Sequence, residues 1–340
     1  MRVKAPFPRL SRGKGAFTRK HGRGRAANLA QSPSVTLDDL PDWLPVWCAE
    51  QLGAEPVRVR FELRSMSTVF GLRLAGGQDV VVKAREDDGR AASCVAAQTW
   101  LADNGFPCPR PLTPPVRVGA LAVHAEEFRP GGELLPGDSP DVAVRYAEVF
   151  ARLMAGLAGL AVPPPLPNPR WSRWDHRDPG VWPSIASLDE LDQSAVPAYV
   201  VDTARRVRER LLVADLPCVL GHADFEAQNL CWHGTDVWSV HDWDSLAWQP
   251  EAALVGGASG VFPKTGPARL PPIESSAAFL TAYQEHRGRR FTEEEQEVAW
   301  AASLWTAAHD VRWEALHGKP PSVNDALRAQ AAERLRRANA

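Results

Sequence analysis

The chain has 340 residues, of which 44% are hydrophobic, and its 39 basic side chains are nearly balanced by 41 acidic ones. This length and composition can build a substantial core, usually divided into more than one lobe, so we expect a soluble globular protein. No apolar run approaches the roughly eighteen residues of a membrane-spanning helix, and no secretory signal is recognisable, so we expect a cytoplasmic protein with no membrane partner.

Charge is distributed unevenly along the chain. Residues 1–35 contain nine Lys or Arg and no acid, which leaves thirty basic against forty-one acidic side chains in the rest. An arm rich in Arg, Lys, Gly and Pro cannot bury enough apolar surface to fold alone, so we predict that it is disordered. It could bind nucleic acid, but nothing in the body adds a basic face, so we rank nucleic acid last among partners. The acidic body suits cationic small molecules better.

The five cysteines stand at positions 48, 94, 108, 218 and 231. They are odd in number and scattered, without the paired spacing of zinc ligands or of a disulfide framework. We therefore expect reduced and mostly buried thiols.

The first part of the body reads as a small antiparallel sheet with one helix packed on it. Before the sheet, Thr36 and Asp38 indicate a helix start, and Gly53 indicates the end of the apolar segment that follows. Period-two apolar patterns then predict strands at 57–63, 69–74 and 80–83, an Ala-rich helix at 91–103, and two further strands within 116–128.

After Gly131 the apolar residues recur at helical spacing, beginning with a helix that Ser139 and Pro140 open. A proline-rich break leads into RWSRWDHRD at 170–178, where aromatic and charged residues alternate as they do at the edge of a pocket. Further helices are expected at 197–212, 275–286, 292–316 and 323–339, with a Gly/Pro-rich loop at 256–272.

The most informative stretch is 221–242, which reads GHADFEAQNLCWHGTDVWSVHD. Phosphoryl transfer needs a carboxylate that orients the attacking hydroxyl and oxygen ligands that hold Mg²⁺ on the phosphates. Asp224 fits the first role, and Asn229 and Asp242 fit the second, because two short strands between them form a hairpin that folds them back toward each other. His222 is included as a supporting residue of the catalytic loop, since a loop histidine more often braces the backbone than transfers a proton.

Each of these residues alone would carry little information, because Asp and Asn are common in ordinary turns. The order and spacing of the three together favour a kinase.

A second signal is DVVVKAR at 79–85, which places Lys83 at the end of an apolar strand. The chain has only six lysines against thirty-three arginines, and Lys83 is the sole lysine between residues 21 and 263. A compact ammonium acts as a point charge on phosphate oxygens, so we predict a phosphate contact. The alternative is a lysine whose head reaches solvent from a strand end.

HADFEAQN and the VHDWDS that follows resemble the aminoglycoside phosphotransferase and choline kinase group of protein-kinase-like enzymes, over roughly residues 50–315. The resemblance implies an α+β, protein-kinase-like fold with two lobes: a small antiparallel β-sheet lobe with one helix at 36–130, and a larger, mainly helical lobe at 131–340. It also implies that Asp224 is the catalytic base, that Asn229 and Asp242 bind Mg²⁺, and that Lys83 contacts the phosphates of ATP.

Two more segments take their roles from the same resemblance. AVHAEEFRP at 122–130 resembles the hinge that contacts adenine, which we place at Glu126, Glu127 and Phe128. RSMSTVF at 64–70 would be the turn that covers the phosphates, with Ser65 and Ser67 as donors to anionic oxygens. This turn has no glycine before Gly71, so an ordinary strand turn is an equally good interpretation.

The sequence departs from the family pattern at the first helix of the sheet lobe. There the family has a Glu that pairs with the strand lysine, and the register places Cys94 at that position. A thiol is neither a strong acceptor nor normally charged. Gln98 and residues 86–88 are alternative partners that the sequence does not rank. A second hypothesis follows: a catalytically weak or inactive nucleotide-binding protein of the same fold.

The leading hypothesis is an ATP-dependent phosphotransferase acting on a hydroxyl of a small molecule such as an aminoglycoside, an amino alcohol or a sugar. Asp244, two residues beyond Asp242, is the best single candidate for a substrate contact or for bracing the loop. Other acidic candidates for the acceptor side, most of which we interpret as solvated charges, are Glu226, Glu251, Asp310 and Glu314. Neither the acceptor nor the oligomeric state follows from the sequence.

Overall fold

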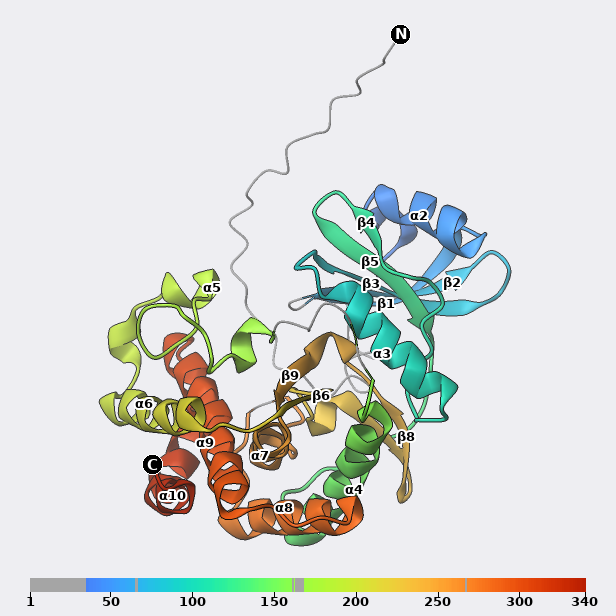
Figure 1. The fold of residues 1–340 in the computed structure, drawn as a ribbon. Coiled ribbons are helices and arrows are strands. Elements are labelled where there is room, and N and C mark those ends of the chain that lie inside the picture. The colour runs from blue at the N-terminus through green and yellow to red at the C-terminus, as the bar shows by residue number, and fades with distance from the viewer. Residues whose placement is uncertain (1–34, 65–66, 161, 163–167, 267) are drawn as a thin grey trace.

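The computed structural model describes residues 35–340 except 65–66, 161, 163–167 and 267. The predicted basic arm therefore lies outside the described residues apart from Val35, and so does Ser65. The described chain forms a sheet region followed by a larger, mainly helical region (Figure 1).

The sheet region contains five antiparallel strands in the order β1-β2-β3-β5-β4. The strands are β1 (Pro56–Arg64), β2 (Ser67–Leu74), β3 (Asp79–Glu86), β4 (Val116–Val118) and β5 (Leu121–Glu127). Successive side chains of a strand point to opposite faces. Val80 and Val82 of β3 therefore share one face, which packs against Leu44 and Trp47 of helix α2 (Trp43–Leu52).

Helix α2 was predicted from a start signal and an end signal. The end signal is where it was predicted, but the start signal precedes the helix. The start signal forms a separate 3₁₀ turn, η1 (Leu37–Asp39), with Thr36 and Asp39 bonded to each other in a capping box. The helix ends at Gly53, whose φ of 73° is left-handed and therefore favours glycine.

The opposite face of the sheet carries Lys83 and a small apolar cluster that includes Phe61, Val69 and Val81. Helix α3 (Ala91–Asp103) connects the two regions, because its buried residues, among them Leu101, belong to the core of the helical region. The face of the sheet that carries Lys83 is directed at the helical region.

The helical region is built around one large core. Its helices are α4 (Pro140–Leu157), α5 (Ala186–Asp189), α6 (Ala198–Val213), α7 (Glu251–Val261), α8 (Ile273–Arg287), α9 (Glu293–Leu316) and α10 (Ser322–Ala338), with 3₁₀ turns η2 (Arg170–Ser172) and η3 (Gln193–Ala195). Phe150 of α4 contacts Phe225, with ring centroids 4.7 Å apart. Since Phe225 follows Asp224 directly, this contact fixes the predicted catalytic loop on the helical core.

Two small antiparallel sheets lie in the helical region, below the five-stranded sheet (Figure 1). One pairs β6 (Cys218–His222) with β9 (Leu246–Pro250), and the other is the hairpin of β7 (Leu230–His233) and β8 (Asp236–Val240). Short 3₁₀ turns, η4 (Ala227–Asn229) and η5 (Trp243–Ser245), precede β7 and β9.

The structure confirms the predicted α+β class, with an antiparallel sheet before a mainly helical region. All five cysteines are free, and four of them are buried. In the part of the chain that the structure describes, every helix is too short or too polar to cross a bilayer. The prediction of a loop at 256–272 is wrong for its first six residues, because these form the second half of α7.

The glycines that suggested a loop serve close packing of α7 on α9. A Cβ atom at Gly256 would lie 2.6 Å from the Cα atom of Ala299 on α9, whereas a Cβ atom at Gly257 would meet nothing nearer than Thr306 Cγ2 at 3.8 Å. Two helices can approach this closely only where one of them lacks a side chain.

We therefore expect Gly256→Ala to lower the free energy of unfolding by roughly 1–3 kcal/mol or more, because neither backbone can move without disturbing the core. The neighbouring Gly257→Ala should range from neutral to stabilising by about 1 kcal/mol, through helix propensity. Urea-induced unfolding of the two variants checks this. Equal midpoints for the pair would contradict the proposed contact.

Candidate active site

The three residues of the predicted transfer motif meet at the base of the β7–β8 hairpin. Asn229 directly precedes β7, and its backbone oxygen accepts a hydrogen bond from the backbone N–H of His241 at 2.8 Å. Asp242 follows His241. The Asn229 Nδ2 donates to the backbone oxygen of Asp224 at 2.9 Å and lies 3.3 Å from its carboxylate Oδ2. The hairpin and these bonds bring Asp224, Asn229 and Asp242 together.

His222 is fully buried in the same loop, where both ring nitrogens contact backbone atoms. The backbone N–H of Asp224 donates to Nδ1 at 3.2 Å, so Nδ1 is an acceptor, and Nε2 then donates to the backbone oxygen of His241, also at 3.2 Å. Burial lowers the pKa of His222 despite the nearby charges of Asp224 and Asp242. A neutral imidazole therefore ties the Asp224 loop to the residue before Asp242.

Asp242 has a left-handed backbone, with φ 66° and ψ 45°. Only one other non-glycine residue in the described chain has a positive φ, and it is the helix-ending Asn339. A left-handed non-glycine residue costs free energy and persists where surrounding structure enforces it. Ser245 supplies part of that structure. Its Oγ lies 3.4 Å from Asp242 Oδ2, and its backbone N–H donates to the backbone oxygen of Asp242 at 3.0 Å.

The donor set at this site suits a metal ion that arrives with a phosphorylated ligand. Among the described residues there is no group of three or more His, Cys, Asp or Glu side chains arranged to hold a metal. Mg²⁺ commonly takes one or two protein oxygens and obtains the rest from water and phosphate. The Asn229 amide nitrogen is already used on Asp224, so its Oδ1 atom is available, and Asp242 adds a carboxylate.

Lys83 lies across from this site on β3 and is 1% exposed. Its Nζ is 3.0 Å from Oε2 of Glu126, which is 2% exposed. The Gln98 amide of α3 donates to the same Oε2 at 2.9 Å and to the Pro109 backbone oxygen at 2.7 Å. The buried lysine is thus paired with a carboxylate, which the predicted Cys94 position does not supply: burial raises the pKa of the Cys94 thiol to about 12.

Asp244 is buried among cations of the sheet region. Its Oδ1 lies 3.5 Å from Nη1 of Arg85, and its backbone oxygen accepts a hydrogen bond from Arg90 at 3.0 Å. Burial alone would raise the pKa of Asp244, but the charges of Lys83 and Arg85 outweigh it, and the pKa is lowered. Since Arg90 caps α3, Asp244 links the loop after Asp242 to the start of that helix.

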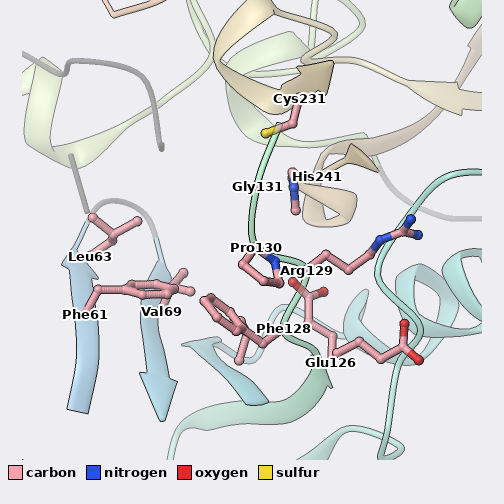
Figure 2. Close-up of a pocket in the computed structure, with 12 residues that line it drawn as sticks. Phe61, Leu63, Val69, Glu126, Phe128, Arg129, Pro130, Gly131, Cys231 and His241 are labelled. Atoms are coloured by element: carbon pink, nitrogen blue, oxygen red, sulfur yellow. The ribbon is translucent and has the colours of Figure 1, made fainter. Parts of the chain in front are cut away.

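A pocket opens between the face of the sheet that carries Phe61 and Val69 and the β7–β8 hairpin (Figure 2). It contains about 580 Å³ of empty space, part of which is open solvent. Apolar side chains of the sheet form one wall, the segment from Glu126 to Gly131 forms the edge, and Cys231 and His241 close it from the hairpin. The predicted hinge residues Glu126, Glu127 and Phe128 all line this pocket; Ser67, at the start of β2, does not.

A family model described as the phosphotransferase enzyme family matches residues 66–288 of the sequence. The chain belongs to this family. No curated protein sequence matches it. Its fold is protein-kinase-like, as predicted.

Three solved structures share this fold at low sequence identity. Amicoumacin kinase, solved with AMP-PNP, Ca²⁺ and Ami, is 13% identical with a TM-score of 0.56, over 83% of this chain and 89% of its own. A Thermobifida fusca protein assigned as a fructosamine-3-kinase is 18% identical with a TM-score of 0.52, over 86% of this chain and 98% of its own. An aminoglycoside phosphotransferase from Alicyclobacillus acidocaldarius is 14% identical with a TM-score of 0.50, over 91% of this chain and 95% of its own.

The remaining acidic candidates of this phosphotransferase are paired rather than solvated. Glu226 is 2% exposed and lies 2.7 Å from Nζ of Lys264, which also lies 3.4 Å from Asp310. Burial and the charge of Asp224 raise the pKa of Glu226. The backbone oxygen of Lys264 accepts a hydrogen bond from Gln228 at 2.9 Å, which fixes it beside the catalytic loop.

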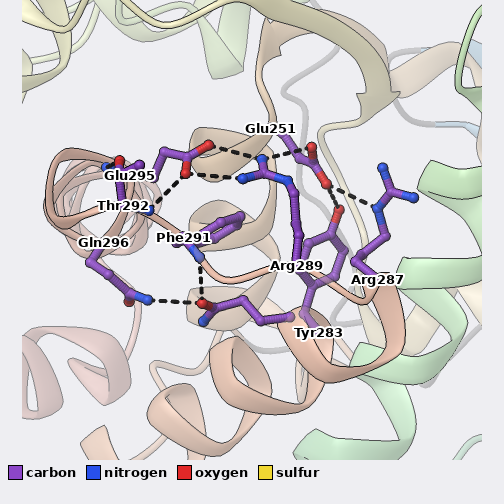
Figure 3. Close-up of polar contacts among 9 residues, drawn as sticks. Glu251, Tyr283, Arg287, Arg289, Phe291, Thr292, Glu295 and Gln296 are labelled. Atoms are coloured by element: carbon purple, nitrogen blue, oxygen red, sulfur yellow. Dashed lines mark hydrogen bonds and ion pairs between the residues drawn. The ribbon is translucent and has the colours of Figure 1, made fainter.

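The other two acids have structural partners farther from the loop. Glu251 at the start of α7 binds Tyr283, Arg287 and Arg289 (Figure 3). Glu314 accepts hydrogen bonds from the backbone N–H groups of Val323 and Asn324, at the start of α10. Both therefore stabilise helix packing.

Sequence reasoning missed Lys264, which lies beside the candidate site. A signal was present: in a chain that uses arginine for most of its cations, the next lysine after Lys83 is Lys264. Lys83 is buried and Lys264 is 15% exposed, and each places a compact ammonium against a buried carboxylate beside the candidate site.

Proposed function

We propose that this phosphotransferase moves the γ-phosphate of ATP to a hydroxyl group of a small molecule. In this proposal Asp224 orients the hydroxyl and accepts its proton, while Asn229 and Asp242 hold Mg²⁺. The metal, when bound, neutralises charge on the phosphates. Lys83 contacts phosphate oxygens from the sheet region, which we take as a nucleotide-binding lobe at 36–130, with the catalytic lobe at 131–340.

The convergence of Asp224, Asn229 and Asp242 carries this proposal. One hairpin, one fully buried histidine and the Asn229 amide fix the three residues against each other. Asp242 also keeps a strained backbone in the same place. Residues held in sparsely populated backbone regions cluster at active sites and ligand clamps.

The pocket supports a nucleotide as the donor. Its apolar walls suit a flat base, and the backbone from Glu126 to Phe128 at its edge offers hydrogen-bonding groups. The pocket extends to His241, the residue before Asp242, so a base bound there would direct its phosphates toward the metal ligands and Lys83. The related amicoumacin kinase was solved with an ATP analogue and a divalent cation, which agrees with this choice of donor.

The acceptor is a small hydroxylated molecule whose charge the site does not specify. An acidic pocket for polyamines would require free carboxylates near Asp224, but Glu226 and Asp310 share Lys264. Asp244 is surrounded by cations, so we propose that it braces the metal-binding loop instead of contacting substrate. Neutral hydroxylated acceptors are therefore as suitable as cationic ones.

A turnover screen tests the function directly. Purified protein with ATP and Mg²⁺ is incubated with hydroxylated antibiotics, amino alcohols and sugars, and a gain of one phosphoryl group is sought by mass spectrometry. We expect a phosphorylated product that disappears with excess chelator and returns when Mg²⁺ is restored. Tight nucleotide binding without transfer or hydrolysis across a broad panel would instead favour the inactive nucleotide-binding protein.

A further inference from the structure

The charge that neutralises Lys83 comes from a strand rather than from a helix. On the β3–β5 ladder Lys83 is opposite His124 and Val81 is opposite Glu126. Lys83 and Glu126 are therefore diagonal neighbours on one face of the sheet, a spacing that long side chains can bridge. The 3.0 Å ion pair between them is almost completely excluded from solvent. Without Glu126, the buried Lys83 ammonium would lose the carboxylate in direct contact with it and keep only the more distant charge of Asp244.

Helix α3 contributes an amide to this pair and no charge. Gln98 donates to the Oε2 atom of Glu126, the same atom that lies beside Lys83 Nζ. Its second hydrogen bond, to the Pro109 backbone oxygen, fixes the orientation of the amide. The neutral Cys94 lies one turn earlier on α3, in an environment dominated by Arg90 and Asp244.

We propose that Glu126 is the residue that positions the phosphate-binding lysine, with Gln98 orienting its carboxylate. The proposal rests on the phosphotransferase function given above. A buried ammonium on a flexible four-carbon chain has no fixed position unless a carboxylate holds it. Because phosphoryl transfer depends on placing charges accurately, an ammonium that has lost this support should slow the reaction more than it weakens nucleotide binding.

The Lys83–Glu126 pair also connects two parts of the site. Glu126 lines the pocket proposed for the base, while its carboxylate holds the residue proposed for the phosphates. One side chain of β5 thus lines the pocket proposed for the base and contacts the ammonium proposed for the phosphates. A helix is not needed to complete the ion pair.

An exchange of the two side-chain types tests this role. Glu126→Gln removes the carboxylate at nearly constant volume, and we expect kcat to fall about 10²-fold with a much smaller change in the dissociation constant of Mg–ADP. Adding Gln98→Glu to that variant restores one amide and one carboxylate across the same hydrogen bond. Since Lys83 and Gln98 both contact Oε2, the carboxylate stays near the ammonium, and at least tenfold of the lost kcat should return.

The outcomes separate the two proposals. An exposed acid at the end of β3, the strand that carries Lys83, provides the matched control: Glu86→Gln should keep the wild-type kcat. The positioning role is refuted if wild-type protein is active and Glu126→Gln has the same kcat as wild type. It is also refuted if the double variant folds but is as slow as Glu126→Gln. Should Glu126→Gln fail to fold, the double variant alone decides, because it retains both groups. Wild-type protein without any turnover would refute the phosphotransferase function itself.

Discussion

Replacing Asp242 with Asn is expected to lower kcat by about 10³-fold or more, because a carboxylate ligand of the phosphate-bound metal typically stabilises the transition state by several kcal/mol. Asparagine is chosen over alanine since it tolerates the left-handed backbone at this position, where φ is 66°. The fold should therefore survive. Phosphate transfer measured over a range of Mg²⁺ concentrations, with thermal unfolding in parallel, checks both parts.

The same hairpin offers a matched control for this substitution. Asp236 is exposed at the start of β8, on the turn side of the hairpin, and Asp236→Asn removes an identical charge away from the site. It should keep wild-type activity and stability. A folded Asp242→Asn protein with an unchanged rate at saturating Mg²⁺ would show that another group binds the metal.

The transfer motif could be predicted because its residues are close together in the chain. Asp224, Asn229 and Asp242 are separated only by a 3₁₀ turn and a two-stranded hairpin, so local backbone preferences decide their geometry. The period-two and helical patterns likewise predicted the sheet and most helices, since burial on one face is written directly into the spacing of apolar residues.

Long-range pairing was less predictable. Glu126 was predicted to contact adenine at a hinge; it does line the pocket, but its side chain is also bonded to Lys83 and Gln98. Nothing local in AVHAEEFRP distinguishes an acid that faces solvent from one that faces a lysine on the next strand. The choice depends on the strand register and on which side chain α3 presents, and both are properties of the assembled sheet.

The second half of helix α7 was predicted as a loop for a related reason. Its glycines have low helix propensity, and local reasoning therefore favours a loop. The close approach of Gly256 to α9 reverses this preference, because packing two backbones together outweighs the cost of ordering glycine. Tertiary contacts decide the conformation wherever local preference is weak or opposed to them.

Asp224→Asn is the second substitution with a large expected effect. Removing the proposed general base should lower kcat by about 10²–10⁴-fold. Nucleotide affinity should change little, because the pocket is lined by the sheet region and the hairpin and does not include Asp224. The asparagine side chain still has an Oδ1 atom to accept the bond from Asn229 Nδ2, so the loop should keep its shape. Single-turnover transfer and Mg–ADP titration measure the two effects separately.

The control for this variant is Asp215→Asn, on the exposed segment that leads into β6. It removes the same charge from the chain a few residues before the loop and should leave kcat unchanged. A parallel loss of nucleotide affinity and rate in Asp224→Asn would mean that the loop had collapsed, which a lower melting temperature would reveal. A folded variant that transfers phosphate at the wild-type rate would instead remove Asp224 from the mechanism, because no carboxylate would then be needed to position the hydroxyl.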